Sequence, residues 1–188
     1  MNEPDLISRS QNGDVAAFET LVRRYDQQVL GFVLSVLKNT EDAQDAFQEI
    51  FLKAFQALPH FRRESRFSTW LYRIAYNTCV SFLRRQKRGE KVSSLDEMGE
   101  AVASARFVSG NGWNPEEGVL KREFEGLVHK AVANLSPKRQ AIFALRYQND
   151  LSLQEISTVT GLSLGAVKNH LFQIHRKLRL SLQSYREA

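Results

Sequence analysis

The stretch 151–182 constrains the fold most, because its pattern predicts two helices joined by a tight turn. Ser152 can cap the first helix, and Glu155, three residues later, completes a capping box. Gly161 marks the end of that helix, since glycine adopts a positive φ without steric cost. Ser163 is placed to cap a second, longer helix. The pattern is therefore typical of a helix-turn-helix.

The second helix of this stretch separates apolar side chains from basic and amide side chains. One face carries Val167, Leu171, Ile174 and Leu178. The opposite face offers amide and guanidinium donors and no carboxylate, which suits the major groove of DNA. An ordinary helical hairpin packed in a larger core is the alternative. If the stretch binds DNA, the contacts are expected from Ser163, Gly165, Lys168, Asn169, Phe172, Arg176 and Arg179.

Basic side chains gather in two separate blocks of the chain, whose net charge is +5. Residues 59–88 carry eight basic side chains and one acidic side chain, and residues 136–188 carry eight and three. The segments 1–58 and 89–135 are both net acidic. Such segregation predicts two places where the protein holds a polyanion.

Several classes of function find no support in the composition. Cys79 is the one cysteine, so an intramolecular disulfide is impossible, and we expect a packed hydrophobe in a reducing cytoplasm. No apolar run approaches a membrane span, and no leader-like segment opens the chain. The four histidines lack metal-ligand spacing, and no nucleophile–base pair is evident. We expect no enzyme activity, cofactor, metal, membrane contact or small-molecule substrate.

Two amphipathic helices are predicted in the first third of the chain. Asp14 can cap the first, over 14–38, whose wide apolar stripe suggests packing on two neighbours. Thr40 is placed to cap the second, over 40–58, and acidic residues follow in its first turn. The stripe expected to be buried in the second helix comprises Ala43, Ala46, Phe47, Ile50, Phe51, Ala54, Phe55 and Leu58.

The opposite face of the second helix is polar apart from one leucine. Leu52 stands there among Asp45, Gln48 and Glu49. A single exposed leucine is ordinary on a protein surface. An apolar centre with a polar rim is also typical of a protein-docking patch. Spacing alone leaves both interpretations open.

The basic block 59–88 contains a loop and a further predicted helix. Pro59 ends the preceding helix, and the loop sets arginines among Phe61 and Phe67. The outward stripe of the helix is expected to comprise Trp70, Arg73, Asn77, Ser81, Arg84 and Arg88. Aromatic rings stack on unpaired bases, and guanidinium groups hold the phosphate backbone. The block therefore favours single-stranded nucleic acid, with core aromatics beside a solvated basic face as the alternative.

Residues 89–114 change character, since Gly, Ser and Ala dominate and no period persists, so they are predicted to be a linker. Pro115 is placed to open a helix that runs to about Asn134. Ser136 and Pro137 give a second start signal, for a helix that buries Ile142, Phe143 and Leu145.

These pieces, in this order, resemble an RNA polymerase sigma factor of the extracytoplasmic-function type, in the sigma-70 family. The resemblance is carried by DAQDAFQEIFLKAF (42–55), FRRESRFSTWLYRIAYN (61–77) and LSLQEISTVTGLSLGAVKNHL (151–171). It implies an all-α fold with sigma region 2 over 1–88, a flexible linker over 89–114 and sigma region 4 over 115–188. It implies a transcription initiation factor that directs core polymerase to promoters.

The resemblance also implies how each segment is used. The first would dock on the β′ clamp helices of core polymerase through Asp45, Gln48, Glu49 and Leu52. The third would read the minus thirty-five element through the helix-turn-helix residues given above. The polymerase β flap, promoter DNA and an anti-sigma factor are the other partners implied. The second would bind the minus-ten element and open the duplex, with residues 61–69 forming a pocket for a flipped base. The contacts implied are Phe61, Arg62, Arg63, Ser65, Phe67, Thr69, Trp70, Arg73, Asn77, Ser81 and Arg84.

Two rival functions fit parts of the sequence. A conventional repressor or activator could use the same helix-turn-helix, with residues 1–88 as a sensing or dimerisation domain. A helical adaptor would show no salt-sensitive affinity for nucleic acid. The aromatic and arginine-rich helix argues against both, since neither function requires a single-strand platform.

Overall fold

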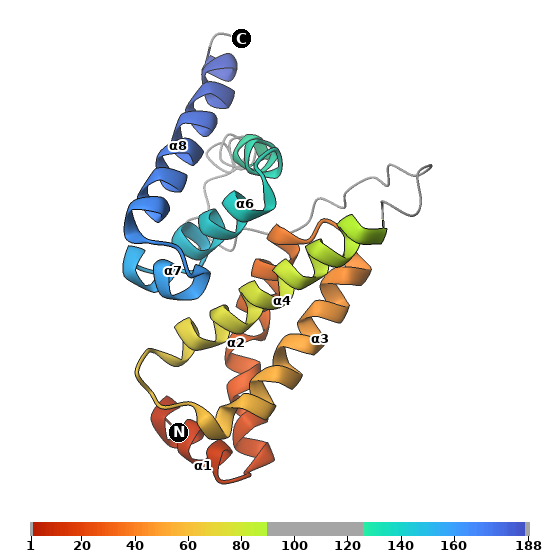
Figure 1. Ribbon diagram of the computed structural model, residues 1–188, viewed down its shortest axis with the longest axis vertical. Helices are drawn as coiled ribbons and strands as arrows, with labels where there is room; N and C mark the ends of the chain where they lie inside the picture. The colour runs from red at the N-terminus through yellow and green to blue at the C-terminus, as the bar shows by residue number, and fades with distance from the viewer. Residues whose placement is uncertain (1, 90–125, 187–188) are drawn as a thin grey trace, which may run out of the picture. The chain divides into compact units, whose positions relative to one another are not determined.

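The computed structural model describes residues 2–89 and 126–186, and all regular structure in these ranges is helical (Figure 1). The all-α expectation is therefore confirmed. The chain divides into two compact units, one N-terminal and one C-terminal. The predicted linker and the start of the helix at Pro115 lie outside the described residues, apart from Gly89. No helix in the described ranges combines the length and the hydropathy needed to cross a membrane.

The described part of the N-terminal unit consists of four α-helices and one short 3₁₀ helix. These are α1 (Glu3–Gln11), α2 (Val15–Val36), α3 (Thr40–Ala57), η1 (Leu58–His60) and α4 (Phe67–Gly89). The three long helices α2, α3 and α4 pack pairwise on one another, whereas α1 packs on α2 and η1. In Figure 1, α1 lies at the end of this bundle that also carries the loop between η1 and α4.

The N-caps of α2 and α3 can be compared with the caps predicted from the sequence. Asp14 caps α2 as predicted, because its Oδ1 accepts a hydrogen bond of 3.0 Å from the amide of Ala17. The predicted cap of α3 is wrong by one residue. Asn39 is the N-cap, its Oδ1 accepting from the amides of Glu41 at 2.8 Å and Asp42 at 3.3 Å, and Thr40 is already helical. An asparagine amide oxygen serves this position at least as well as a threonine hydroxyl.

Helix α1 was not predicted, because nine residues are too few for a strong periodic signal. It is capped by Asn2, whose Oδ1 accepts from the amide of Asp5 at 3.0 Å. Leu6 and Ile7 are buried against the rest of the unit. Tertiary packing therefore stabilises this short helix.

The core of the N-terminal unit is built from side chains of all four α-helices. Leu6, Leu21, Phe32, Ile50 and Tyr72 are among its fully buried members. The rings of Phe32 and Tyr72 meet edge to face with centroids 5.6 Å apart. Burial raises the pKa of the Tyr72 hydroxyl well above its ordinary value.

Cys79 belongs to the same core and is fully buried, as expected for a packed hydrophobe. Its burial raises the pKa of the thiol to about 12. The thiolate, the reactive form, is therefore strongly disfavoured at neutral pH.

The C-terminal unit contains a helical segment over 126–133, α6 (Pro137–Phe143), the π-helical turn η2 (Ala144–Gln148), α7 (Leu153–Thr160) and α8 (Leu164–Arg186). Helix α6 packs on α8. Ile142, Phe143 and Leu145 are buried as predicted. Ser136 and Pro137 occupy the N-cap and first helical positions, although the Ser136 hydroxyl makes no capping hydrogen bond. The π turn had no signal in the sequence.

The predicted helix-turn-helix is confirmed in its local geometry. The amide of Ser152 donates to Glu155 Oε2 at 2.9 Å, and the amide of Glu155 donates to Ser152 Oγ at 3.2 Å, which completes the capping box. Gly161 has a φ of +70° between α7 and α8. Ser163 Oγ accepts from the amide of Ala166 at 3.2 Å and caps α8.

We expect Asn39→Ala to lower the free energy of unfolding of the N-terminal unit by about 1 kcal/mol, because two amides of α3 lose their acceptor. Thr40→Ala, the matched control, should change it by a few tenths at most. Urea unfolding followed by Trp70 fluorescence in a Trp113→Phe background measures both. A larger effect of Thr40→Ala would restore threonine as the cap.

Candidate nucleic-acid and polymerase interfaces

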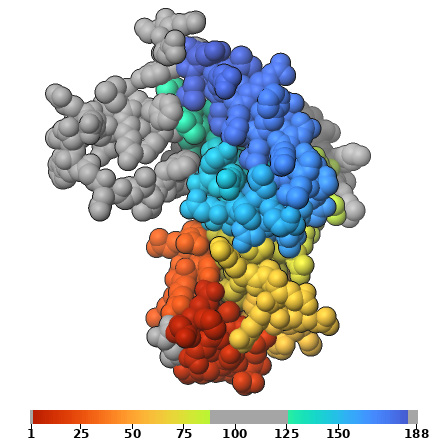
Figure 2. Space-filling model, turned by 90° about the vertical axis from the view of Figure 1, so that its left-hand side faces the viewer, coloured from red at the N-terminus to blue at the C-terminus, as the bar shows by residue number. Residues whose placement is uncertain are grey.

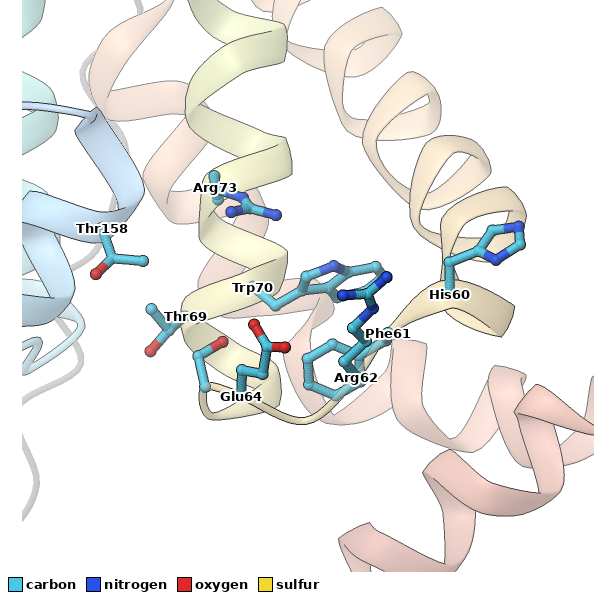
Figure 3. A pocket seen from close by; sticks show the side chains of 9 residues that line it. His60, Phe61, Arg62, Glu64, Thr69, Trp70, Arg73 and Thr158 are labelled. Atoms are coloured by element: carbon cyan, nitrogen blue, oxygen red, sulfur yellow. The ribbon is translucent and has the colours of Figure 1, made fainter.

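The loop between η1 and α4 forms a surface pocket at the start of α4 (Figure 3). Three rings pack beneath it, with centroids 5.0 Å apart for Phe61 and Trp70, 5.4 Å for Phe67 and Trp70, and 5.9 Å for Phe61 and Phe67. All three side chains are at most 9% exposed. The residues of this unit that line the pocket are His60, Phe61, Arg62, Glu64, Ser65, Thr69, Trp70 and Arg73.

The pocket includes most, but not all, of the residues from the loop and the first turn of α4 that were expected to bind an unpaired base. Phe61, Arg62, Ser65 and Thr69 line it, whereas Phe67 supports it from below. The guanidinium of Arg63 is bonded to α1 and does not line the pocket. Glu64 lines the pocket and lies within the segment 61–69 that was predicted to form it, whereas His60 lines the pocket although it was not predicted.

The expectation that Trp70 lies on the outward stripe of α4 is wrong. Trp70 is 9% exposed because Phe61 and Phe67 pack on its indole. Tyr72 and Tyr76 on the same helix are also buried. Helical spacing placed Trp70 in line with Arg73, but it could not show that the loop folds back over the first turn. The aromatic side chains therefore form the floor of a pocket and not an open stacking platform.

The rest of the stripe on α4 lies on the surface as predicted, and it is polar. Arg73, Asn77 and Arg84 are exposed, and Ser81 is half-buried with its Oγ donating to the carbonyl of Asn77 at 3.0 Å. Within the described part of the chain, neither Arg73 nor Arg84 forms an ion pair. The side chain of Arg88, the last member of the predicted stripe, lies outside what the structure describes. Donors for phosphates and bases therefore continue from the pocket along α4.

The polar face of α3 presents an apolar side chain to solvent. Leu52 is 58% exposed, and Asp45 and Gln48 on the same face are exposed as well. The expectation that Phe55 is buried is wrong, because 42% of the residue is exposed even though its ring packs on that of Phe18 with centroids 5.0 Å apart. This enlarges the apolar part of the α3 surface.

Glu49 is placed differently from the other predicted docking residues. Its carboxylate is 2.6 Å from Lys53 Nζ and 3.3 Å from Arg85 Nη2, so it joins α3 to α4. The hydrogen bond from Lys53, followed by that from Arg85, lowers the pKa of Glu49. Arg85 also lies over the Phe82 ring at 4.3 Å. Glu49 is therefore a bridging residue at the edge of the α3 face.

The exposed face of α8 contains every residue predicted for it. Val167, Leu171 and Ile174 are buried on the opposite side. Phe172 is the most exposed large apolar residue on this face, at 63%. The residues exposed as predicted are Ser163, Gly165, Lys168, Asn169, Phe172, Arg176 and Arg179.

Two further features of the C-terminal unit bear on its surface chemistry. The Tyr147 hydroxyl is hydrogen-bonded to Nε2 of His175, which links η2 to α8. Burial, followed by the charges of Lys138 and Arg139, lowers the pKa of His170.

The described residues of both units contain no group of three or more His, Cys, Asp or Glu that could hold a metal ion.

Comparison with known proteins relates both units to one family. The family model for Sigma-70 region 2 matches residues 21–89, and that for Sigma-70 region 4 matches residues 125–178. The chain is 34% identical to the RNA polymerase sigma-H factor of Pseudomonas aeruginosa over 186 residues, covering 96% of this chain and 94% of the relative. It is 34% identical over 182 residues to the ECF RNA polymerase sigma-E factor of Escherichia coli K12, covering 95% and 93%.

A solved structure shares the fold. The sigma factor RpoE in complex with the anti-sigma factor NepR from Bartonella quintana matches with a TM-score of 0.68 and 18% identity, covering 88% of this chain and 96% of that one. Two family models and two relatives that align along almost the entire sequence indicate the same family. The chain therefore belongs to the extracytoplasmic-function group of the sigma-70 family of RNA polymerase sigma factors.

Proposed function

We propose the following division of labour by which this sigma factor directs core RNA polymerase to promoters. Residues 1–88 bind core polymerase and the minus-ten element, residues 89–114 link the domains, and residues 115–188 bind the minus thirty-five element. The observation that carries the minus-ten assignment is the position of Arg73. It lines the loop pocket and also begins the exposed stripe of α4.

In this proposal the loop pocket takes one unpaired base and the stripe of α4 holds the neighbouring strand. Flipping a base out of a duplex costs a few kcal/mol. Contacts within the pocket offset part of that cost, so captured bases bias the duplex toward opening. Arg62, Ser65 and Thr69 supply polar atoms at the pocket, while the rings of Phe61 and Trp70 supply its apolar wall.

The C-terminal unit is assigned to duplex DNA. Asn169 has the amide geometry that pairs with adenine in the major groove, and Arg176 and Arg179 suit guanine or phosphate. Lys168 and the capping region at Ser163 suit the phosphate backbone. Because both units would neutralise phosphates, promoter binding by the holoenzyme should weaken steeply with salt.

Core polymerase is assigned to the exposed face of α3. Leu52 supplies an apolar centre, Asp45 and Gln48 supply a polar rim, and Glu49 contributes from the edge while it holds Lys53. By family resemblance this face meets the β′ clamp helices, and the β flap is a second polymerase contact. An anti-sigma factor is a further proposed partner, since the similar Bartonella protein was solved with one.

The protein itself is proposed to catalyse nothing. It would act by binding promoter DNA and polymerase together, so its place of action is the bacterial cytoplasm, where both partners reside. A conventional repressor or activator would bind its operator without polymerase. Run-off transcription with core polymerase alone and with the protein added separates the two functions. Specific transcripts should appear only in the second reaction, and their absence would favour the repressor or activator.

We expect the double variant Arg73→Ala, Asn77→Ala to reduce promoter opening about tenfold or more, because strand contacts of the captured bases are lost. Permanganate reactivity of unpaired thymines in the holoenzyme complex measures opening. Co-purification with core polymerase should be unchanged.

The pair Arg23→Ala, Gln27→Ala on α2 is a matched control, since these residues are exposed and have the same spacing. It should leave permanganate reactivity as in the parent protein. Full reactivity in the Arg73, Asn77 variant would remove α4 from the opening mechanism.

Leu52→Asp should weaken association with core polymerase about tenfold or more, because a charge replaces the apolar centre of the docking face. Competition against the unmodified protein for limiting core enzyme measures the change. Leu180→Asp is the control, since Leu180 is 60% exposed but lies on α8. Equal competition by Leu52→Asp and the parent protein would exclude this face as a docking site.

A further inference from the structure

The loop that forms the pocket is fastened to the N-terminal helix by side chains distant in sequence. Gln11, at the end of α1, donates from Nε2 to the carbonyl of Leu58 at 3.1 Å and to that of Phe61 at 2.8 Å. Its Oε1 accepts from Arg63 Nη2 at 3.1 Å. One half-buried amide therefore holds both ends of η1 and a residue of the loop.

Arg63 adds a second attachment at the point where the loop reverses. Its Nη2 also donates to Ser8 Oγ at 2.7 Å. Its backbone adopts a φ of +59°, in the left-handed region that L-residues with a Cβ rarely occupy. Such a conformation persists only where the surroundings impose it. The hydrogen bonds to Ser8 and Gln11 are in position to impose it, since they fix the guanidinium on α1.

Helix α1 is itself held firmly on the unit. Leu6 and Ile7 are buried, and Arg9 Nη2 lies 2.6 Å from Asp14 Oδ2, the capping residue of α2. In Figure 2 the surface of the first residues lies directly beside that of the loop and the start of α4. Helix α1 therefore provides a rigid attachment site for the loop.

A second connection reaches the floor of the pocket. The Tyr25 hydroxyl donates to a carboxylate oxygen of Glu3 on α1. The Tyr25 ring lies 5.4 Å from that of Phe67, which packs under Trp70. Both the rim and the floor of the pocket are therefore connected to α1.

We propose that α1 sets the base specificity of the pocket, with Gln11 and Arg63 as positioning residues that fix the loop backbone and do not touch DNA. The proposal rests on the assignment of the pocket to an unpaired base. In this proposal the neighbouring residues Arg62 and Arg63 have separate functions. Arg62 faces the bound strand, whereas Arg63 holds the loop from behind.

The first test concerns the loop alone. In the full-length Gln11→Ala variant, hydrogen exchange at the Phe61 amide, which donates to Leu58 O at 3.0 Å, should rise about tenfold, while amides in the middle of α2 and α3 keep their rates. Gln28→Ala, an exposed glutamine on α2, is the matched control and should change nothing. Parent-like exchange in Gln11→Ala would overturn the proposal.

The second test concerns base choice. The holoenzyme selects from a pool of short randomised single-stranded DNA, and sequencing gives the base preference at each position. Gln11→Ala should reduce the strongest preference about tenfold, because a loosened pocket no longer excludes wrong bases. Total affinity for oligothymidylate should stay within about twofold, since the stripe of α4 is intact. A retained preference would overturn the proposal and leave the pocket assignment standing.

The salt dependence of DNA binding distinguishes a residue that positions the loop from a residue that contacts phosphate. Arg63→Gly removes the guanidinium but accepts the positive φ, so base preference should fall while the salt slope of binding is unchanged. Arg62→Ala should lower that slope by about one. A slope reduced by Arg63→Gly would make Arg63 a DNA contact and overturn its positioning role. If the unmodified protein shows no base preference, the pocket assignment itself fails, and this inference with it.

Discussion

The packing of three rings at the start of α4 is the interaction on which the candidate site depends. Phe61 from the loop closes over Trp70, and Phe67 supports both from the first turn. Aromatic pairs of this kind contribute about 0.5–1.5 kcal/mol beyond the area they bury. This packing removes the indole from solvent, fixes the loop on the helix and leaves Arg73 at the rim. The polar residues of the pocket are held in place because their apolar neighbours are buried.

Around the aromatic floor of the pocket, arginine side chains have three different functions. Arg62 and Arg73 line the pocket. Arg63 is hydrogen-bonded to Gln11 on α1, and Arg85 forms an ion pair with Glu49 on α3. In sequence all four belong to a single basic block that indicates a polyanion site. In the tertiary structure, Arg63 and Arg85 form contacts that hold a loop and a helix to neighbouring helices. The charge available to DNA is therefore smaller, and more precisely placed, than the composition of the block suggests.

The two units differ in how strongly local sequence specifies them. In the helix-turn-helix each signal is short in range. The Ser152–Glu155 box, the positive φ of Gly161 and the Ser163 cap act within three residues, and all were predicted correctly. In the N-terminal unit the decisive contacts join residues far apart, such as Gln11 and Phe61, so no periodicity or cap could reveal them. The same limit explains the failure to predict α1, whose nine residues are stabilised by packing.

The sequence by itself determined the all-α class, the boundaries of α2 and α7 to within one or two residues, and the start and exposed face of α8, because helical period, caps and glycine act locally. It misplaced Trp70 and the cap of α3, and it gave no sign that Glu49 and Arg63 are hydrogen-bonded to other helices. Only the tertiary structure showed that the indole forms a floor, that Glu49 bridges two helices and that Arg63 is bonded to α1. Whether a side chain faces solvent or another helix depends on which segments meet in space, and spacing within one segment carries no information about that.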